Sequence, residues 1–476
     1  MITETETAFL AVIRAFLTEE KAAPAEFEGL TEKQWNHLFV LASRHSLPAA
    51  VYDVVGKTPA FLQLSAEFRG QIKMQAMQSV MQQVSRTALF LADEKELEKT
   101  GVQPLVMKGI VCRSLYAKPD LRPSGDEDLL IQANDFAAVD AYFVKKGLVR
   151  DKEWAGSGDA IPEEMGYIHP QTGAFYEIHT SMFSRNSFAY GYLNQAFSNV
   201  FEHPSRIEVQ GQTIYTLEET RHLFYLLCHS FKHFLHGGVG IRQICDMVQM
   251  IRAYGSKIDW KLFWRLCEQY HMECFCINLL DIGERYLGFS YEASGAVRCT
   301  KKIRPNSEAL LTDILDAGAF GKSSAGRIHS ANITLYAAET GANERKTGTG
   351  GVWKSLFPES SYIRNTYPYA AKHPCLIPAA YAQRIFKWIW EQKSRNEKKS
   401  SIEVGTERVA LLKKYDMIRT AEDPREGKNR NPKQKKEKAE RNTAKSRAAS
   451  KMRLKFLKSD ERKKGGTHAG RTQRGK

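Results

Sequence analysis

The stretch RPSGDEDLLI, residues 122–131, decides the fold because it places two carboxylates two positions apart at the head of an apolar run. Side chains alternate between the faces of a β-strand, so Asp126 and Asp128 share one face while Glu127 and Leu129 share the other. Two ionised carboxylates this close repel each other, and a divalent cation between them relieves the repulsion. The alternative interpretation is an acidic strand end at the protein surface.

The residue types in this strand indicate which cation it would hold. The run offers carboxylate oxygens and neither His nor Cys, which favours Mg²⁺ or Mn²⁺ over Zn²⁺. Relief of the repulsion means that Asp128→Asn is expected to leave stability unchanged or slightly improved. A third candidate carboxylate, Glu177, lies in AFYEIH, residues 174–179, whose alternation is typical of a strand. We expect Glu177 to lie across from the two aspartates on an adjacent antiparallel strand.

The elements around these acids follow a definite order. Residues 102–107 form a short apolar strand, Lys108-Gly109 turns the chain, and residues 110–116 have helical spacing before the strand with the two aspartates begins. This order, with the spacer YAKPDLR at residues 116–122, resembles the uncharacterised bacterial nucleotidyltransferases of the DNA polymerase β-like superfamily. The resemblance implies an α+β fold, with a mixed sheet and flanking helices embedded in a largely helical chain.

The resemblance extends over roughly residues 30 to 395. Its supporting segments are WNHL (35–38), ASRHSLP (42–48), HSFKHF (229–234), GIRQICD (240–246), LFP (356–358) and YP (367–368). One departure is Lys108-Gly109, which stands where the superfamily usually has Gly-Ser or Gly-Gly. The gap from Gly109 to Asp126 is 126 − 109 = 17 positions, longer than the common superfamily spacing.

The resemblance implies a reaction in which a nucleoside monophosphate moves from an NTP to an acceptor hydroxyl or amine by two-metal-ion catalysis. It assigns Asp126 and Asp128 to both ions and Glu177 to the ion that activates the acceptor. The acceptor itself is not identified. A different class of function is a non-catalytic nucleotide-binding or antitoxin-like interaction module that docks through a basic tail, and retention of all three acids argues against it.

The phosphates of the NTP are assigned to further residues. Ser124 and the amide of Gly109 would hold phosphate oxygens, while Lys108 or Arg122 would neutralise charge on the leaving group. In related nucleotidyltransferases a helical domain closes over the nucleotide.

That closure makes Lys232 and Arg242 candidate phosphate contacts. The alternatives are that these two residues are surface charges or form a buried pair with Asp246.

Four histidines fall on one stripe of the helix expected after residue 216, at positions 222, 229, 233 and 236. The stripe could face a substrate groove, hold zinc through an H-x-x-x-H pair, or form a polar face packed against the catalytic domain. Thr216 and Glu219 have the spacing of a capping box for this helix, and Asn134 is expected to cap a helix over residues 135–146.

The charge of the chain is concentrated at one end. Residues 424–476 hold 20 Lys and Arg against 5 Asp and Glu, which leaves 69 − 20 = 49 basic and 54 − 5 = 49 acidic residues elsewhere. Such a segment is too polar to offset its ordering entropy and is expected to be disordered. It is either a solvated tail or an anchor for RNA or another polyanion.

Four regions follow from these patterns: an N-terminal helical region (1–100), a nucleotidyltransferase catalytic domain (101–216), a helical domain (217–395) and a basic, mostly disordered tail (396–476). Eight cysteines without a C-x-x-C pair indicate a reduced, cytoplasmic protein. No apolar run is long enough for a membrane span, so no membrane partner is expected.

Overall fold

The computed structural model describes residues 2–21, 26–151, 161–318, 325–340, 357, 360, 363–364, 367–394 and 400–418. These residues belong to one compact unit, which runs from Met1 to Arg419. The segment 424–476 lies outside the described residues, so its expected disorder and its expected binding to RNA or another polyanion stay predictions.

Five helices precede the sheet: α1 (Glu4–Thr18), α2 (Glu32–Arg44), α3 (Pro48–Val55), α4 (Pro59–Leu62) and α5 (Ala66–Glu98). The threonines Thr3 and Thr31 start α1 and α2 with capping boxes, which satisfy backbone N–H groups that have no partner within the helix. All five lie within residues 1–100, the region expected to be helical.

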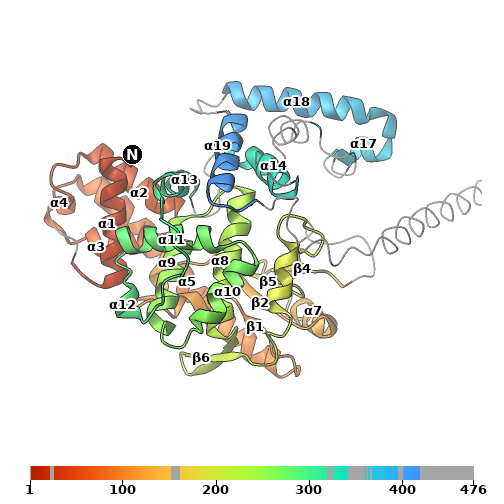
Figure 1. Ribbon diagram of the computed structural model, residues 1–476, viewed down its shortest axis with the longest axis horizontal. Coiled ribbons are helices and arrows are strands. Elements are labelled where there is room, and N and C mark those ends of the chain that lie inside the picture. The colour runs from red at the N-terminus through yellow and green to blue at the C-terminus, as the bar shows by residue number, and fades with distance from the viewer. Residues whose placement is uncertain are drawn as a thin grey trace, which may run out of the picture. The chain divides into compact units, whose positions relative to one another are not determined.

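A five-stranded mixed sheet carries the acidic strand. Its order is β1 (Leu105–Val106), β2 (Glu127–Leu130), β5 (Phe175–His179), β4 (Glu164–Ile168) and β3 (Val149–Arg150), and Figure 1 shows β1, β2, β5 and β4 lying together. The pair β2–β5 is parallel, whereas the other pairs are antiparallel. The antiparallel arrangement expected for the strand of Glu177 is therefore wrong, although that strand is adjacent to β2. The small mixed sheet among many helices is consistent with the expected α+β class.

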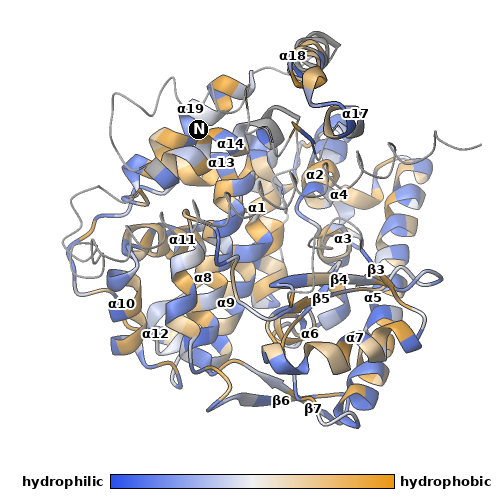
Figure 2. Cartoon of the chain, turned by 90° about the vertical axis from the view of Figure 1, so that its right-hand side faces the viewer, coloured by the Kyte–Doolittle hydropathy of each residue, from blue (hydrophilic) through white to orange (hydrophobic). Residues whose placement is uncertain are grey.

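The two faces of the sheet pack against different helices. Leu129 and Ile131 belong to a core with residues of α6 (Ile110–Arg113), α7 (Phe136–Lys145) and the C-terminal half of α5. Figure 2 shows α6 and α7 together on one side of the strands β4 and β5. Leu130 belongs instead to the large helical core on the opposite face. Alternation along β2 thus follows the predicted strand parity.

The hairpin β6 (Ser205–Val209) and β7 (Gln212–Thr216) leads into α8 (Glu219–His236) and α9 (Ile241–Tyr254). The capping box expected at Thr216 is wrong, because Glu218 caps α8 and the Thr216 hydroxyl donates to the Val106 carbonyl at 2.6 Å. The expected Asn134 cap is also wrong. Residues 133–135 form a 3-10 turn, and α7 begins at Phe136 without a side-chain cap.

The remaining helices are α10 (Trp260–Gln269), α11 (Glu273–Tyr286), α12 (Tyr291–Ser294), α13 (Glu308–Ala317), α14 (Ala325–Thr340), α17 (Pro368–Lys372), α18 (Ile377–Ser394) and α19 (Ser401–Lys414). Short 3-10 segments cover Pro119–Leu121, Gly191–Phe197 and Pro374–Leu376. Within the described part of the chain, no helix is both long and apolar enough to span a membrane.

Side chains from α14 and α19 cap the C-terminal end of α8. The Arg327 guanidinium donates to the Gly237 carbonyl at 2.9 Å, and the Thr334 hydroxyl donates to the Leu235 carbonyl at 2.6 Å. Arg408, fully buried, donates to the Phe234 carbonyl. These bonds satisfy carbonyl groups that have no partner within the helix. The helix α19 belongs to this packing and falls within residues 396–476, the segment expected to be a mostly disordered tail.

Two truncations test how far the folded unit extends. A chain that ends at residue 419 is expected to keep the unfolding free energy of the full-length protein. A chain that ends at residue 399 loses the Arg408 bonds and the buried Val409 and Leu412 side chains, which should cost roughly 5 kcal/mol. Chemical denaturation followed by circular dichroism measures both, and equal midpoints for the two truncations would contradict the assignment of α19 to the folded unit.

Candidate active site

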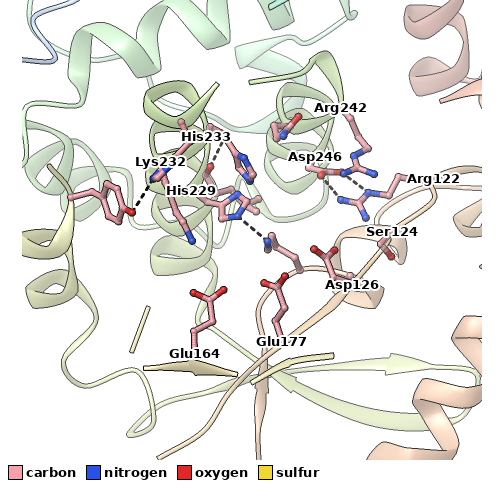
Figure 3. Close-up of a pocket in the computed structure, with 17 residues that line it drawn as sticks. Arg122, Ser124, Asp126, Glu164, Glu177, His229, Lys232, His233, Arg242 and Asp246 are labelled. Atoms are coloured by element: carbon pink, nitrogen blue, oxygen red, sulfur yellow. Dashed lines mark hydrogen bonds and ion pairs between the residues drawn. The ribbon is translucent and has the colours of Figure 1, made fainter. Parts of the chain in front are cut away.

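A cavity of about 650 Å³ lies between the polar face of the sheet and the helices α8 and α9. Figure 3 shows Asp126, Glu164 and Glu177 on one side of it, facing Lys232, His229 and His233 of α8. Arg122, Arg242 and Asp246 gather at one end of the cavity. Eight of the nine candidate residues line it: Lys108, Gly109, Arg122, Ser124, Asp126, Glu177, Lys232 and Arg242. The ninth, Asp128, is 1% exposed and does not line it.

Strand register places the candidate acids together. The Cα atoms of Asp128 and Glu177 are direct partners on the parallel strands β2 and β5. Asp126, one residue before β2, lines the same cavity as Glu177. Glu164 of β4 also lines it, and sequence reasoning did not select this residue. Three carboxylates from the sheet side, Asp126, Glu164 and Glu177, therefore line the cavity, with Asp128 buried next to Glu177.

The residue between the two aspartates fixes their direction. Glu127 points to the opposite face, where its carboxylate accepts from the Ile110 amide at 2.7 Å and from the Arg113 guanidinium at 2.6 Å. Burial raises the pKa of Glu127, while the charge of Arg113 opposes that rise. Gly109 leaves room for this carboxylate, because a Cβ at position 109 would lie 1.8 Å from its Oε2 atom.

The loop before β2 is tied to α5. The Ser124 amide donates to Gln83 at 2.8 Å, and Arg86 donates to the Ser124 carbonyl at 3.0 Å. The Ser124 hydroxyl accepts from Arg113, so this candidate phosphate ligand already has an internal partner. The loop that carries Asp126 is thus held on the long helix through both backbone and side-chain bonds.

Asp128 is surrounded by cations. Its Oδ1 atom lies 3.0 Å from Lys108 Nζ and 3.3 Å from His179 Nε2. Burial raises the pKa of Asp128, but the charge of Lys108 and the contact with His179 outweigh it and hold the pKa well below its usual range. The expected repulsion between paired acids is therefore not the dominant interaction at Asp128. Its neutralisation by Asp128→Asn should lower the stability of the protein rather than improve it.

His179 is the residue that sequence reasoning missed. It follows Glu177 by two positions on β5, and its Nε2 atom lies 3.6 Å from Glu177. Burial lowers the pKa of His179, yet the contacts with Asp128 and Glu177 raise it overall to about 9. Among the described residues, Asp128, Glu177 and His179 form the one group of three candidate metal ligands with donor atoms within 4.8 Å of one another. The E-x-H spacing in the strand was the available signal for this residue.

The histidine stripe divides into two parts. His222 is buried, and its Nε2 atom lies 2.7 Å from the Met107 carbonyl, which ties α8 to the end of β1. His229, His233 and His236 line the cavity, as expected for a groove-facing stripe. His229 Nε2 lies 2.8 Å from Lys108 Nζ. No zinc group of three ligands that includes these histidines is found in the described part of the chain.

The basic end of the cavity contains a buried ion pair. Arg122 donates to Asp246 through Nε at 3.0 Å and also through Nη2, and the Tyr116 hydroxyl donates to the same carboxylate at 2.7 Å. The buried pair considered for Arg242 with Asp246 is instead formed by Arg122. Arg242 is 7% exposed and donates to the Pro123 carbonyl at 2.6 Å, beside this pair.

The family described as uncharacterised nucleotidyltransferase matches residues 31–288. This span covers more than half of the 476-residue chain. The chain belongs to this family. Neither a curated protein nor a solved structure matches it. The matched span begins where the resemblance was expected to begin and ends at residue 288, well before residue 395.

Every candidate residue of the cavity lies inside the span that matches the family. The family supports the general activity of a nucleotide transferase. The helices α14 and α19, which cap the end of α8, lie outside the matched span. The cavity is thus built from family residues, while part of its support comes from residues beyond them.

A substitution at Gly109 tests the position of Glu127. Gly109 has φ +54°, and its Cβ would collide with the buried Glu127 carboxylate, so Gly109→Ala should lower the unfolding free energy by roughly 2 to 5 kcal/mol. Gly125→Ala is the matched control, because nothing lies within 4 Å of its Cβ position. Denaturant titration compares the two variants. A Gly109→Ala protein as stable as Gly125→Ala would contradict the close approach.

The raised pKa of His179 predicts a pH dependence of stability. A group whose folded pKa lies above its unfolded value stabilises the protein fully below pH 6.5 and loses that effect as the pH rises through about 9. In a buffer that contains a metal chelator, the unfolding free energy should therefore fall by up to about 3 kcal/mol between pH 6.5 and about 9. The fall should vanish in His179→Gln. The buried His45 and His222, with pKa values near 4, do not titrate in this window.

Proposed function

We propose that this protein transfers a nucleoside monophosphate from an NTP to an acceptor hydroxyl or amine and releases pyrophosphate, on a fold of the polymerase β-like superfamily. The observation that carries the proposal is the Oδ2 atom of Asp128. This atom is buried and has no hydrogen-bond partner among the described residues. Its carboxylate stands with Glu177 and His179 in a group whose donor atoms lie within 4.8 Å of one another. A buried carboxylate oxygen without a partner destabilises the protein unless a bound ligand, such as a cation, interacts with it.

The residues at this position fit a divalent cation. Asp126, Asp128 and Glu177 would hold Mg²⁺ or Mn²⁺, with His179 beside them. When bound, such ions neutralise phosphate charge and increase the acidity of an acceptor hydroxyl. The proposal requires these three carboxylates to lie close together, and Asp126 and Glu177 line the cavity while Asp128 is buried next to Glu177.

The chain's own cations would bind the triphosphate. Lys108 and Arg242 line the cavity near the acids, and the Arg122 guanidinium lies at the same end within its pair with Asp246. Phosphate oxygens at this end would receive hydrogen bonds from these groups and from the turn at Gly109. Ser124 holds the loop before β2 in place through its bonds to α5 and Arg113.

The acceptor would enter from the opposite end of the cavity. Glu164 and Lys232 lie there in Figure 3. Tyr190 and His236 also line the cavity, and their Oη and Nε2 atoms are 3.0 Å apart. Burial raises the pKa of Glu164. A polar end of this kind suits a hydroxyl or amine acceptor, because its groups can both donate and accept hydrogen bonds.

Removal of one acid tests the proposal. Asp128→Asn should lower pyrophosphate release from each NTP by at least about 100-fold, because it removes a cation ligand. The same change should lower the unfolding free energy by roughly 3 kcal/mol, since Lys108 and His179 lose their buried anion. The control is Asp140→Asn, which removes an acid that is paired with Arg150 outside the cavity and should leave release unchanged.

Circular dichroism shows whether the Asp128→Asn protein is folded. Glu177→Gln is a second variant, because Glu177 is more exposed than Asp128 and has fewer cationic partners. Titration calorimetry with each NTP and Mg²⁺ accompanies the release assay. Wild-type protein that binds NTP and releases no pyrophosphate with any acceptor class would overturn the transferase proposal in favour of a non-catalytic nucleotide-binding module.

A further inference from the structure

Lys108 lies between the acidic strand and α8. Its Nζ atom is 3.0 Å from Asp128 Oδ1 and 2.8 Å from His229 Nε2, and its side chain is 15% exposed. The lysine therefore has an anionic partner on one side and a neutral acceptor on the other. Its four-carbon stem is flexible, so the ammonium can move without a change in the backbone.

His229 is built to accept from this ammonium. Burial and the charge of Lys108 hold the pKa of His229 well below its usual value, so the imidazole is neutral. A neutral imidazole offers one lone pair, and the geometry gives that lone pair to Lys108. His229 is held in turn by His233, whose ring centroid lies 4.4 Å from its own.

In the free protein, the Lys108 ammonium already balances the negative charge of Asp128. Lys108 and His179 both lie within 3.3 Å of Oδ1 of this single carboxylate. A divalent cation at the same carboxylate would be placed next to the Lys108 ammonium, and that repulsion is strong in a buried site. Of the two oxygens of the Asp128 carboxylate, Oδ2 is the one without a hydrogen-bond partner among the described residues.

We propose that Lys108 is an internal counter-ion of Asp128 that competes with the divalent cation and is released when the phosphates of an NTP offer it a new anion. The free protein then binds the cation weakly, and NTP and cation bind cooperatively. This inference rests on the proposed function, because it uses the same carboxylates as cation ligands. His229 is a positioning residue in this arrangement, since it acts through Lys108.

The direction in which replacement of Lys108 changes the affinity for the cation separates this role from a purely structural one. If Lys108 competes with the cation, its replacement by an uncharged side chain should tighten cation binding to the free protein. If Lys108 only supports the site, the same replacement should weaken binding, because the site loses a partner of Asp128. Lys108→Met keeps most of the stem and removes the charge.

The experiment measures Mn²⁺ binding to the full-length protein without nucleotide, by electron paramagnetic resonance of the unbound ion. Lys108→Met is expected to bind Mn²⁺ at least about tenfold more tightly than the wild type. The control is Lys118→Met, which removes the same charge from an exposed pair with Asp53 and should bind as the wild type does. Equal or weaker binding by Lys108→Met overturns the inference.

Two further variants keep the test decisive. Asp128→Asn should lose the Mn²⁺ site. If it binds as tightly as the wild type, or if no protein in the series binds Mn²⁺, the proposed cation ligands are wrong and this inference falls with them. If Lys108→Met does not fold, the decision passes to His229→Leu, which loosens the ammonium and should tighten Mn²⁺ binding by about threefold. Unchanged or weaker binding by that folded variant overturns the counter-ion role alone.

Discussion

The buried contact between Glu127 and Arg113 is the constraint on which the candidate site depends. A carboxylate in an apolar core must be paired, and here it is held by a guanidinium and by the amide of Ile110. Because side chains alternate along a strand, an inward Glu127 forces Asp126 and Asp128 outward. The same carboxylate occupies the space that a side chain at Gly109 would need. One ion pair behind the sheet thus sets both the turn and the direction of the acids in front of it.

Local patterns were sufficient to identify β2 and the face that its acids share. Alternation is a property of the strand itself and needs no knowledge of its neighbours. The direction of the neighbouring strand is a different matter, since nothing near Glu177 in the sequence shows that β5 runs parallel to β2. The predicted helix caps were wrong for a similar reason. Thr216 has the residue type of a cap, but a carbonyl of β1 at Val106 accepts its hydroxyl instead.

The electrostatics of the cavity depend on segments far apart in the chain, which is why sequence reasoning described them incompletely. Lys108 and His229 are 121 positions apart, and Arg122 and Asp246 are 124 positions apart. The sequence allowed the candidate residues to be chosen by residue type, but it did not show which distant residues form ion pairs or hydrogen bonds with them. Asp128 was expected to be dominated by repulsion from another acid, and the fold surrounds it with cations. Only a three-dimensional arrangement distinguishes these two situations.

The contacts at the end of α8 have a consequence for how this chain can diverge. Main-chain carbonyls accept all of these hydrogen bonds: Gly237 from Arg327, Leu235 from Thr334 and Phe234 from Arg408. Every residue type supplies such a carbonyl. The hydrogen bonds themselves therefore do not depend on side-chain type, but the packing around them does, because Phe234 and Leu235 are fully buried and a Cβ at Gly238 would lie 2.9 Å from Arg327 Nη2. Divergence at that end of α8 is thus limited by the space available to side chains and not by the hydrogen bonds that join the two parts.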